Sequence, residues 1–270
     1  MRIFITTMDD PIHTNGFIKK IINSRKKDIV GLAVSKATRL KISKQKSKFH
    51  YVISLFLIMG LSSFVMNSFK LFWFKFKKFI SNFIPFISSP SILNYASQNN
   101  IETYVTETVN DKPFLDYLKK MKPDVIINQT QDILKKDFLS ISNIAVINRH
   151  NSLLPKNRGR ITPFWVLYKS EKETGVSIHV VTEELDAGDI IVQKKFKIRS
   201  NDDFNTIVKK NYLLAPIAML KALDILELGT RERIINDNNE ASYNTTPTLE
   251  EALKFRDIRR VRDFFKVLIS

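Results

Sequence analysis

The groups that carbonyl chemistry needs stand within one stretch of this 270-residue chain: the amide of Asn148, the imidazole of His150 and the carboxylate of Asp186. Asn148 and His150 alternate along an extended strand, so both side chains can face the same side. Asp186 follows His150 by 36 residues (186 − 150), enough for one helix and one strand to bring it back. The amide can donate to a developing oxyanion, the imidazole can move a proton and the carboxylate can orient the imidazole. Taken singly, such a His or Asp is usually structural; together they predict carbonyl-group transfer.

Short apolar, β-branched runs alternate with helix-like segments along the first 200 residues, which predicts an α/β fold with a mostly parallel sheet. Asn148 then lies at the carboxyl end of a strand, where such sheets bind ligands. The expected strands are residues 2–6, 28–34, 102–105, 125–128, 145–148, 175–181 and 189–196, and the expected helices are 17–24, 93–98 and 114–120.

The remainder of the chain reads as helical. Ser200 with Asp203, and Thr248 with Glu251, resemble capping boxes that open helices reaching about residues 228 and 255. We therefore expect a catalytic domain over residues 1–200, with an insertion at 41–89, and a helical C-terminal extension over 201–270 packed on it.

Composition favours anionic partners, because the net charge is +16 and the pI is near 9.8. A nucleotide, RNA or an acidic membrane surface would satisfy this. The absence of cysteine excludes disulfides, thiolate nucleophiles and cysteine-based zinc sites, and we expect no metal. The apolar run of residues 3–5 is too short for a signal peptide, so we expect a cytoplasmic protein.

The segment of residues 41–89 does not fit the alternating pattern. Residues 51–69 lack charge and are about long enough to cross a bilayer. Ser62, Ser63, Asn67 and Ser68 weaken that reading, and a span here would separate two halves of one sheet. Residues 69–86 mix lysine with Phe and Trp, as interfacial helices do. Two interpretations stay open: an apolar face packed on the core or on a second subunit in a homodimer, and contact with the inner face of the membrane.

The two surrounding motifs, NxHxSLLPxxRG from Asn148 and ELDAGDII around Asp186, resemble those of the N10-formyltetrahydrofolate-dependent formyltransferases. That family includes methionyl-tRNA formyltransferase, glycinamide ribonucleotide formyltransferase and the sugar-nucleotide N-formyltransferases. The resemblance is specific over residues 148–193 and looser over 1–196. It implies a Rossmann-like formyltransferase fold and N10-formyltetrahydrofolate as formyl donor.

The resemblance also implies roles for residues of this chain. Asn148 would bind the oxyanion, His150 would shuttle the amine proton, and Asp186 would orient His150. The pterin would lie against the loop of residues 129–134 and the turn of 181–186. The expected cofactor contacts are Gln131, Asp132, Ile133, Leu134, Val181 and Glu184, and the expected acceptor contacts are Ser152, Arg158, Arg160, Asp10 and His13.

Three departures bear on the acceptor. Asn151 follows the His where the family often has Pro or Gly, Arg149 replaces a commonly apolar residue, and the first loop, residues 6–10, lacks glycine. The missing glycine speaks against a phosphoribosyl acceptor. Only 84 residues (270 − 186) follow Asp186, and much of this part reads as helix, so we expect less room for the β-barrel of tRNA formyltransferases.

The expected acceptor is therefore the amine of an anionic small molecule, an amino-sugar nucleotide. Three alternatives remain: a methionyl-tRNA formyltransferase-like activity, a formyltetrahydrofolate deformylase activity, and a non-catalytic basic protein that binds membrane or RNA.

Overall fold

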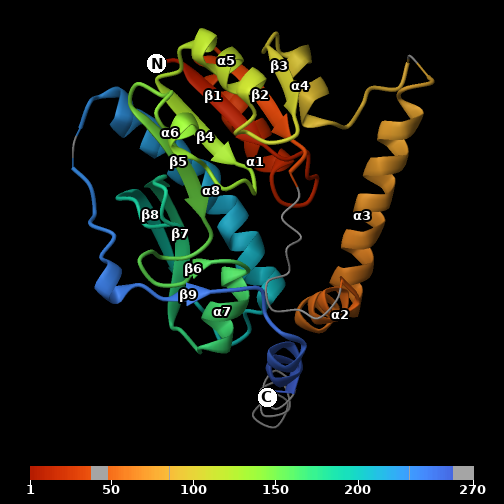
Figure 1. The fold of residues 1–270 in the computed structure, drawn as a ribbon. Helices are drawn as coiled ribbons and strands as arrows, with labels where there is room; N and C mark the ends of the chain where they lie inside the picture. Colours follow the sequence, from red (N-terminus) through yellow and green to blue (C-terminus); the bar gives the residue numbers. More distant parts are fainter. Residues whose placement is uncertain (38–47, 85, 231, 258–270) are drawn as a thin grey trace.

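A computed structural model describes residues 1–37, 48–84, 86–230 and 232–257 of the chain. Within these residues a seven-stranded sheet has the order β3-β2-β1-β4-β5-β7-β8 (Figure 1). Its first five strands run parallel, and β7 and β8 are antiparallel to their neighbours. The strands are β1 (Ile3–Thr7), β2 (Ile29–Ser35), β3 (Thr103–Thr106), β4 (Val125–Gln129), β5 (Ala145–His150), β7 (Glu173–Val180) and β8 (Ile190–Lys197). The prediction of a mostly parallel α/β sheet is confirmed.

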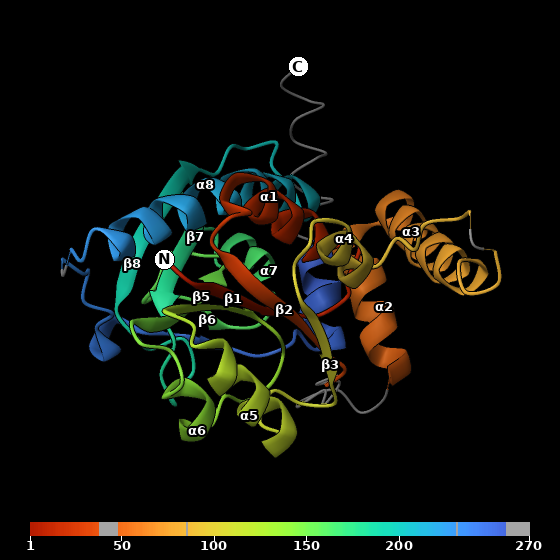
Figure 2. The ribbon, with the colours of Figure 1, turned by 90° about the horizontal axis from the view of Figure 1, so that it is seen from above.

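Helices cover both faces of this sheet (Figure 2). On one face lie α1 (Asn15–Arg25), α4 (Ile92–Gln98) and α8 (Phe204–Glu227), and on the other lie α5 (Lys112–Met121) and α6 (Lys136–Leu139). Strand side chains alternate between the two layers: Ile3 and Ile5 pack under α1 and α8, whereas Phe4 packs under α5. The same alternation turns Asn148 and His150 towards the α5 layer and Arg149 towards α1 and α8.

The predicted strands and helices of the α/β part all exist, with ends that differ by at most two residues. One difference matters, because β5 continues to His150 and therefore carries both Asn148 and His150 within the sheet. The sequence did not indicate α6, α7 (Thr162–Tyr168), the short 3-10 helix η1 (Asn238–Glu240) or the small sheet of β6 (Arg158–Gly159) and β9 (Tyr243–Asn244).

The two expected capping boxes had different outcomes. Thr248 and Glu251 exchange hydrogen bonds, each side chain accepting from the other's backbone N–H, and residues 249–257 are helical. The first expectation was wrong, because α8 is capped by Asp203, whose Oδ1 accepts the N–H of Thr206, and not by Ser200. Helix α8 contributes Ala215, Ala218, Met219, Ala222, Leu223 and Leu226 to the same core as the strands.

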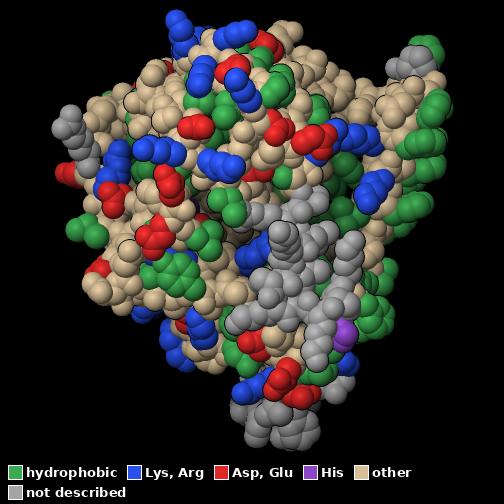
Figure 3. Space-filling model, viewed as in Figure 1, with side chains coloured by type: hydrophobic (Ala, Val, Ile, Leu, Met, Phe, Trp, Pro, Cys, Tyr) green, Lys and Arg blue, Asp and Glu red, His purple; other side chains and the backbone are tan. Residues whose placement is uncertain are grey.

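The insertion forms α2 (Lys48–Met59) and α3 (Leu61–Ile80), joined at Gly60. Parts of the expected insertion (residues 41–47 and 85) and of the C-terminal extension (258–270) lie outside the described residues. Helix α2 packs on the body through Leu57 and Ile58, which join a buried cluster with Phe164 and Phe204. Helix α3 has no buried residue and runs alongside the body (Figures 1 and 3). In the described part of the chain no helix has the length and apolarity needed to cross a membrane.

The contrast between the two insertion helices predicts opposite effects of truncation. Ile58→Ala removes a fully buried side chain and should lower the free energy of unfolding by about 2–5 kcal/mol. Val65→Ala on α3, where the side chain is half exposed, should change it by about 0.5 kcal/mol or less. Urea unfolding of both variants measures the two effects, and equal losses would contradict the arrangement.

Candidate functional site

The pairing of β5 with β7 gathers the polar residues of the site. Asn148 lies opposite His179, and His150 lies opposite Ser177, in an antiparallel register. Side chains opposite one another in such a ladder share a face. One face of the sheet, at the carboxyl end of β5, therefore carries the side chains of Asn148, His150 and His179.

Asp186 returns to this patch from the turn after β7. Its Oδ2 lies 3.5 Å from Nδ1 of His150, and its Oδ1 lies 3.6 Å from Nε2 of His179. The backbone of Asp186 adopts a left-handed conformation, with φ of 51°, which Asp tolerates better than most residues. The structure thus brings the predicted imidazole and carboxylate together.

Two glycines let the Asp186 turn close onto its surroundings. The N–H of Gly159 donates to Oδ2 of Asp186 at 2.9 Å. Gly159 has φ of 99°, and a Cβ there would lie 2.1 Å from the carbonyl oxygen of Asn244. A Cβ on Gly188 would lie 2.1 Å from the carbonyl oxygen of Val180. Both positions therefore require glycine.

The His150 ring is held at both nitrogens. Its Nε2 donates to the backbone oxygen of Asn157 at 2.8 Å, while Nδ1 faces Asp186. The ring is therefore oriented by one oxygen atom on each side. To contact a substrate through Nε2, His150 must break its hydrogen bond to the Asn157 carbonyl and form one to the substrate instead.

The Asn148 amide is oriented by Gln129, a residue that the sequence reasoning did not single out. Nε2 of Gln129 donates to Oδ1 of Asn148 at 2.7 Å and to the carbonyl of Asn128 at 2.6 Å. Because the amide oxygen of Asn148 is occupied, its NH2 group points away from Gln129. Gln129 therefore presents Asn148 as a donor, which is the polarity that an oxyanion requires.

His179, to which the sequence analysis gave no role, completes the polar patch. Its Nδ1 donates to the carbonyl of Val180. Burial lowers its pKa from 6.5 to about 4, although the charge of Asp186 acts in the opposite direction. The ring is therefore neutral at pH 7, and its approach to Asp186 is not an ion pair there. Its place one residue before the end of β7, on the side of the strand that faces the site, was the available signal.

The residues expected to contact the pterin lie in two places. Asp132 accepts hydrogen bonds from Ser35 and Thr108, which fastens the loop after β4 to the ends of β2 and β3. Gln131 is partly exposed in that loop and Ile133 is exposed, whereas Leu134 is buried in the α5 core and offers no open surface. Across the sheet, Val181 donates its N–H to Val146, and Glu184 is exposed and accepts from Tyr243.

Two expected acceptor contacts are corrected by the structure. Arg158 is fully buried and donates to the Tyr243 hydroxyl and to Asn236. Ser152 is also fully buried and donates to the carbonyl of Asn157. Both side chains hold the loops of the site together and present no surface to an acceptor.

The other three expected acceptor residues lie at the carboxyl edge of the sheet. Oδ1 of Asp10 accepts the N–H groups of Ile12 and His13 and so shapes the loop before α1. Nδ1 of His13 lies 2.7 Å from the hydroxyl of Tyr212 on α8. Burial lowers the pKa of His13, opposed by the charge of Asp10. Arg160 is partly exposed and follows β6.

Arg149 joins this group, and the sequence had marked it only as a departure. Its guanidinium lies over the rings of Phe17 and Tyr212, at 4.6 and 5.3 Å from their centroids. Burial lowers its pKa. Nε and Nη1 have no hydrogen-bond partner among the described residues. Buried donors without partners are costly, so this cation suits an anion that is not part of the chain.

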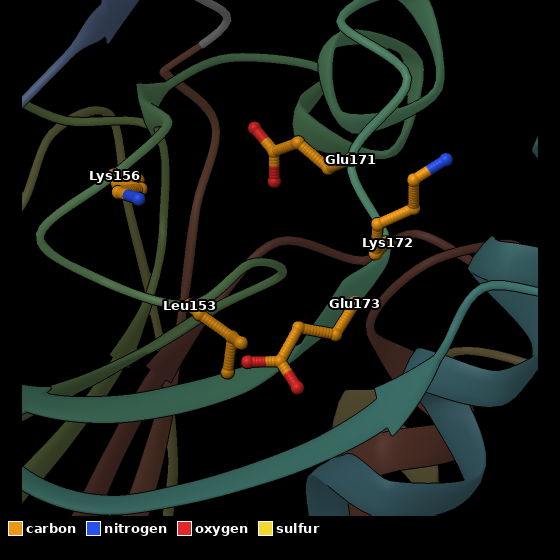
Figure 4. Close-up of a pocket in the computed structure, with 5 residues that line it drawn as sticks. All are labelled: Leu153, Lys156, Glu171, Lys172 and Glu173. Atoms are coloured by element: carbon orange, nitrogen blue, oxygen red, sulfur yellow. The ribbon is translucent and has the colours of Figure 1, made fainter.

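A small open pocket lies beside the loop that follows β5 (Figure 4). Its lining residues are Leu153 and Lys156 of this loop and Glu171, Lys172 and Glu173 near the start of β7. None of these five is a predicted site residue. Within the described residues, no group of three or more His, Asp or Glu side chains is arranged to hold a metal ion.

Comparison with known proteins identifies the family of this site. The family described as formyl transferase matches residues 85–223, which is just over half of the chain and includes Asn148, His150 and Asp186. The chain belongs to the formyl transferase family.

Individual relatives within the formyl transferase family agree. Methionyl-tRNA formyltransferase of Prochlorococcus marinus (strain MIT 9215) is 37% identical over 150 residues, covering 55% of this chain and 45% of the relative. The bifunctional polymyxin resistance protein ArnA of Wigglesworthia glossinidia brevipalpis is 36% identical over 154 residues, covering 57% of this chain and 24% of the relative. The chain thus spans about half or less of the length of these curated relatives.

The fold is also that of a solved formyltransferase. The N-formyltransferase of Helicobacter canadensis, in complex with folinic acid and dTDP-3-aminofucose, superposes with a TM-score of 0.58 at 18% identity, over 91% of this chain and 71% of that one. At this identity the likeness concerns the fold, and it confirms the Rossmann-like formyltransferase architecture.

The depressed pKa of His179 predicts a pH-dependent stability. Unfolded His179 takes a proton near pH 6.5, whereas the folded protein resists it until about pH 4, so stability falls as the pH drops through this window. Between pH 7 and pH 5 this residue should cost the wild type about 2 kcal/mol. The variant His179→Asn cannot titrate at this position, so its free energy of unfolding should fall by about 2 kcal/mol less than that of the wild type over the same interval. Urea unfolding of both proteins at the two pH values measures the difference, and parallel losses would refute it.

Proposed function

We propose that this protein transfers a formyl group from N10-formyltetrahydrofolate to a primary amine on an anionic acceptor, an amino-sugar nucleotide. The observation that carries the proposal is the meeting of Asn148, His150 and Asp186 at the carboxyl end of β5, within the residues that match the formyl transferase family. We further propose that the protein works in the cytoplasm.

The donor would bind between the loop of residues 129–134 and the turn of 181–186. Both segments border β5, and Asp132 and Val181 fix their backbones through hydrogen bonds to neighbouring strands. Fixed backbone groups can read a flat heterocycle without many side chains. The comparison structure from Helicobacter canadensis, which holds folinic acid, supports a folate as the donor.

In the proposed reaction the acceptor amine attacks the formyl carbon, and a new nitrogen–carbon bond forms. The NH2 group of Asn148, set by Gln129, donates to the oxyanion that develops on the formyl oxygen. The bond from the formyl carbon to N10 then breaks, and His150 passes the proton lost by the amine to N10. Asp186 holds His150 in place and balances its positive charge.

An anionic acceptor is supported by the cluster around Arg149. A phosphate-bearing molecule is favoured by the unpartnered donors Nε and Nη1 of this arginine and by the basic charge of the chain. His13 and Tyr212 lie beside the arginine and can add hydrogen bonds to such a molecule. A nucleotide sugar provides both the phosphates and the amine, and the dTDP-3-aminofucose in the Helicobacter canadensis structure supports this choice.

A transfer RNA is the second candidate acceptor. Methionyl-tRNA formyltransferases match this chain at 32–37% identity, and the ArnA protein matches it at 36%. The basic charge would also suit RNA. A direct comparison of the two acceptors therefore decides between them.

The deciding experiment supplies N10-formyltetrahydrofolate with one amine at a time. The amines are dTDP-linked 3-amino and 4-amino sugars, charged initiator tRNA, and none. Release of tetrahydrofolate that needs an amino sugar supports the proposal. Turnover only with tRNA would replace the acceptor, and formate release without any amine would indicate a hydrolase.

His150→Ala and Asp186→Ala should each raise the barrier by about 3 kcal/mol, which slows turnover roughly a hundredfold. Asp137→Ala, on the exposed side of α6, is the matched control and should remain active. Initial rates and circular dichroism are measured for all three. A folded His150 or Asp186 variant with near-normal turnover would refute the assignment.

Gln129→Glu tests the orientation of Asn148. A carboxylate cannot donate to Oδ1 of Asn148, so the amide should rotate and present its oxygen to the substrate. The kcat should fall roughly a hundredfold with little change in the KM for folate, as for Asn148→Asp, and the double variant should be no worse than either single one. Gln98→Glu on α4 is the control. A fall in which KM alone changes, or strict additivity, would show that Gln129 does not act through Asn148.

A further inference from the structure

Helix α3 presents a continuous apolar stripe to solvent. Along the stripe lie Val65, Phe69, Phe72, Trp73, Phe76 and Phe79, spaced by three or four residues and between 45 and 63% exposed. Figure 3 shows these hydrophobic side chains along the outer edge of the molecule, over α3. Exposed apolar residues are common singly, but a stripe of aromatic side chains on one helix marks an interaction surface.

The opposite side of α3 is attached to the body, which fixes the direction of the stripe. Phe64 meets Phe56 of α2 with ring centroids 5.6 Å apart, and the Asn67 amide reaches the sulfur of Met59. Near the other end, Nζ of Lys78 lies 2.7 Å from Oδ2 of Asp9. The helix is therefore held with its stripe facing outward.

Lysines border the stripe, and α3 itself carries no acidic residue. Lys70 and Lys77 are seven residues apart and lie along one edge, and Lys75 lies towards the other. No Asp or Glu occurs between Asp28 and Glu102, whereas ten Lys or Arg do. This stretch carries ten positive charges against a net charge of +16 for the whole chain, and four of the ten are lysines of α3.

We infer that α3 docks on the surface of an anionic lipid bilayer, with its aromatic stripe in the interfacial region and its lysines at the headgroups. Aromatic rings favour the interface, and lysine stems extend along apolar surface to reach phosphate. A second copy of the chain fits less well, because two such helices would face each other with positive edges only. The helix lies on the membrane surface, in keeping with the lack of a membrane-crossing helix among the described residues.

Vesicle flotation of the full-length protein tests this inference without any need for turnover. The protein should float with vesicles of phosphatidylcholine containing about a third phosphatidylglycerol, and only weakly with phosphatidylcholine alone. Lys70→Gln with Lys77→Gln should weaken binding to the anionic vesicles roughly thirtyfold. Lys119→Gln with Lys120→Gln, exposed on α5, should leave it unchanged.

The stripe itself is tested by Phe72→Glu with Phe76→Glu, which should abolish flotation. The matched control is Leu213→Glu with Ile217→Glu, a pair with the same spacing and similar exposure on α8, which should float like the wild type. Because Trp73 is exposed and Trp165 is buried, added vesicles should shift the fluorescence emission to shorter wavelength. Trp73→Phe should remove that shift while flotation persists.

Three results would overturn the inference. The first is a wild type that does not float with the anionic vesicles, and the second is a Phe72→Glu, Phe76→Glu variant that still floats. The third is a wild type that light scattering shows to be a dimer while this variant is a monomer, which would make the stripe a subunit interface.

Discussion

The site depends on one carboxylate, that of Asp186, whose side chain is only 9% exposed. A buried carboxylate is tolerated only when hydrogen bonds and charges around it replace water. Asp186 finds these at the backbone N–H of Gly159 and at the imidazole of His150. The left-handed turn at Asp186 and the close approaches at Gly159 and Gly188 follow from this requirement, because each lets a chain segment come near enough to contribute.

Local sequence patterns predicted what local physics decides. Alternating apolar residues located the strands, and Thr248 with Glu251 located a helix start, because each signal lies within a few neighbouring residues. The trio was proposed from spacing and resemblance, and β5 carries two of its members on alternate positions.

The remaining site residues depend on contacts between distant segments, which spacing does not reveal. Arg158 is buried because Tyr243, 85 residues later, and Asn236 fold over it. The role of Gln129 depends on the register of β4 against β5, and that of His179 on the register of β5 against β7. The exposure of α3 could not be read from the presence of apolar residues alone, because α2, which is also rich in them, packs against the body.

The pairing of β6 with β9 gives the site an order of assembly. Gly159, which donates to Asp186, is itself paired with Asn244, and Trp165 donates to the carbonyl of Thr245. On a ribosome, the whole parallel sheet and the trio emerge before residues 243–245 do. The wall behind Asp186 is thus completed by residues that follow the whole sheet in the chain, so a nascent chain that has already formed its sheet still lacks a finished site until residues 243–245 have been synthesised.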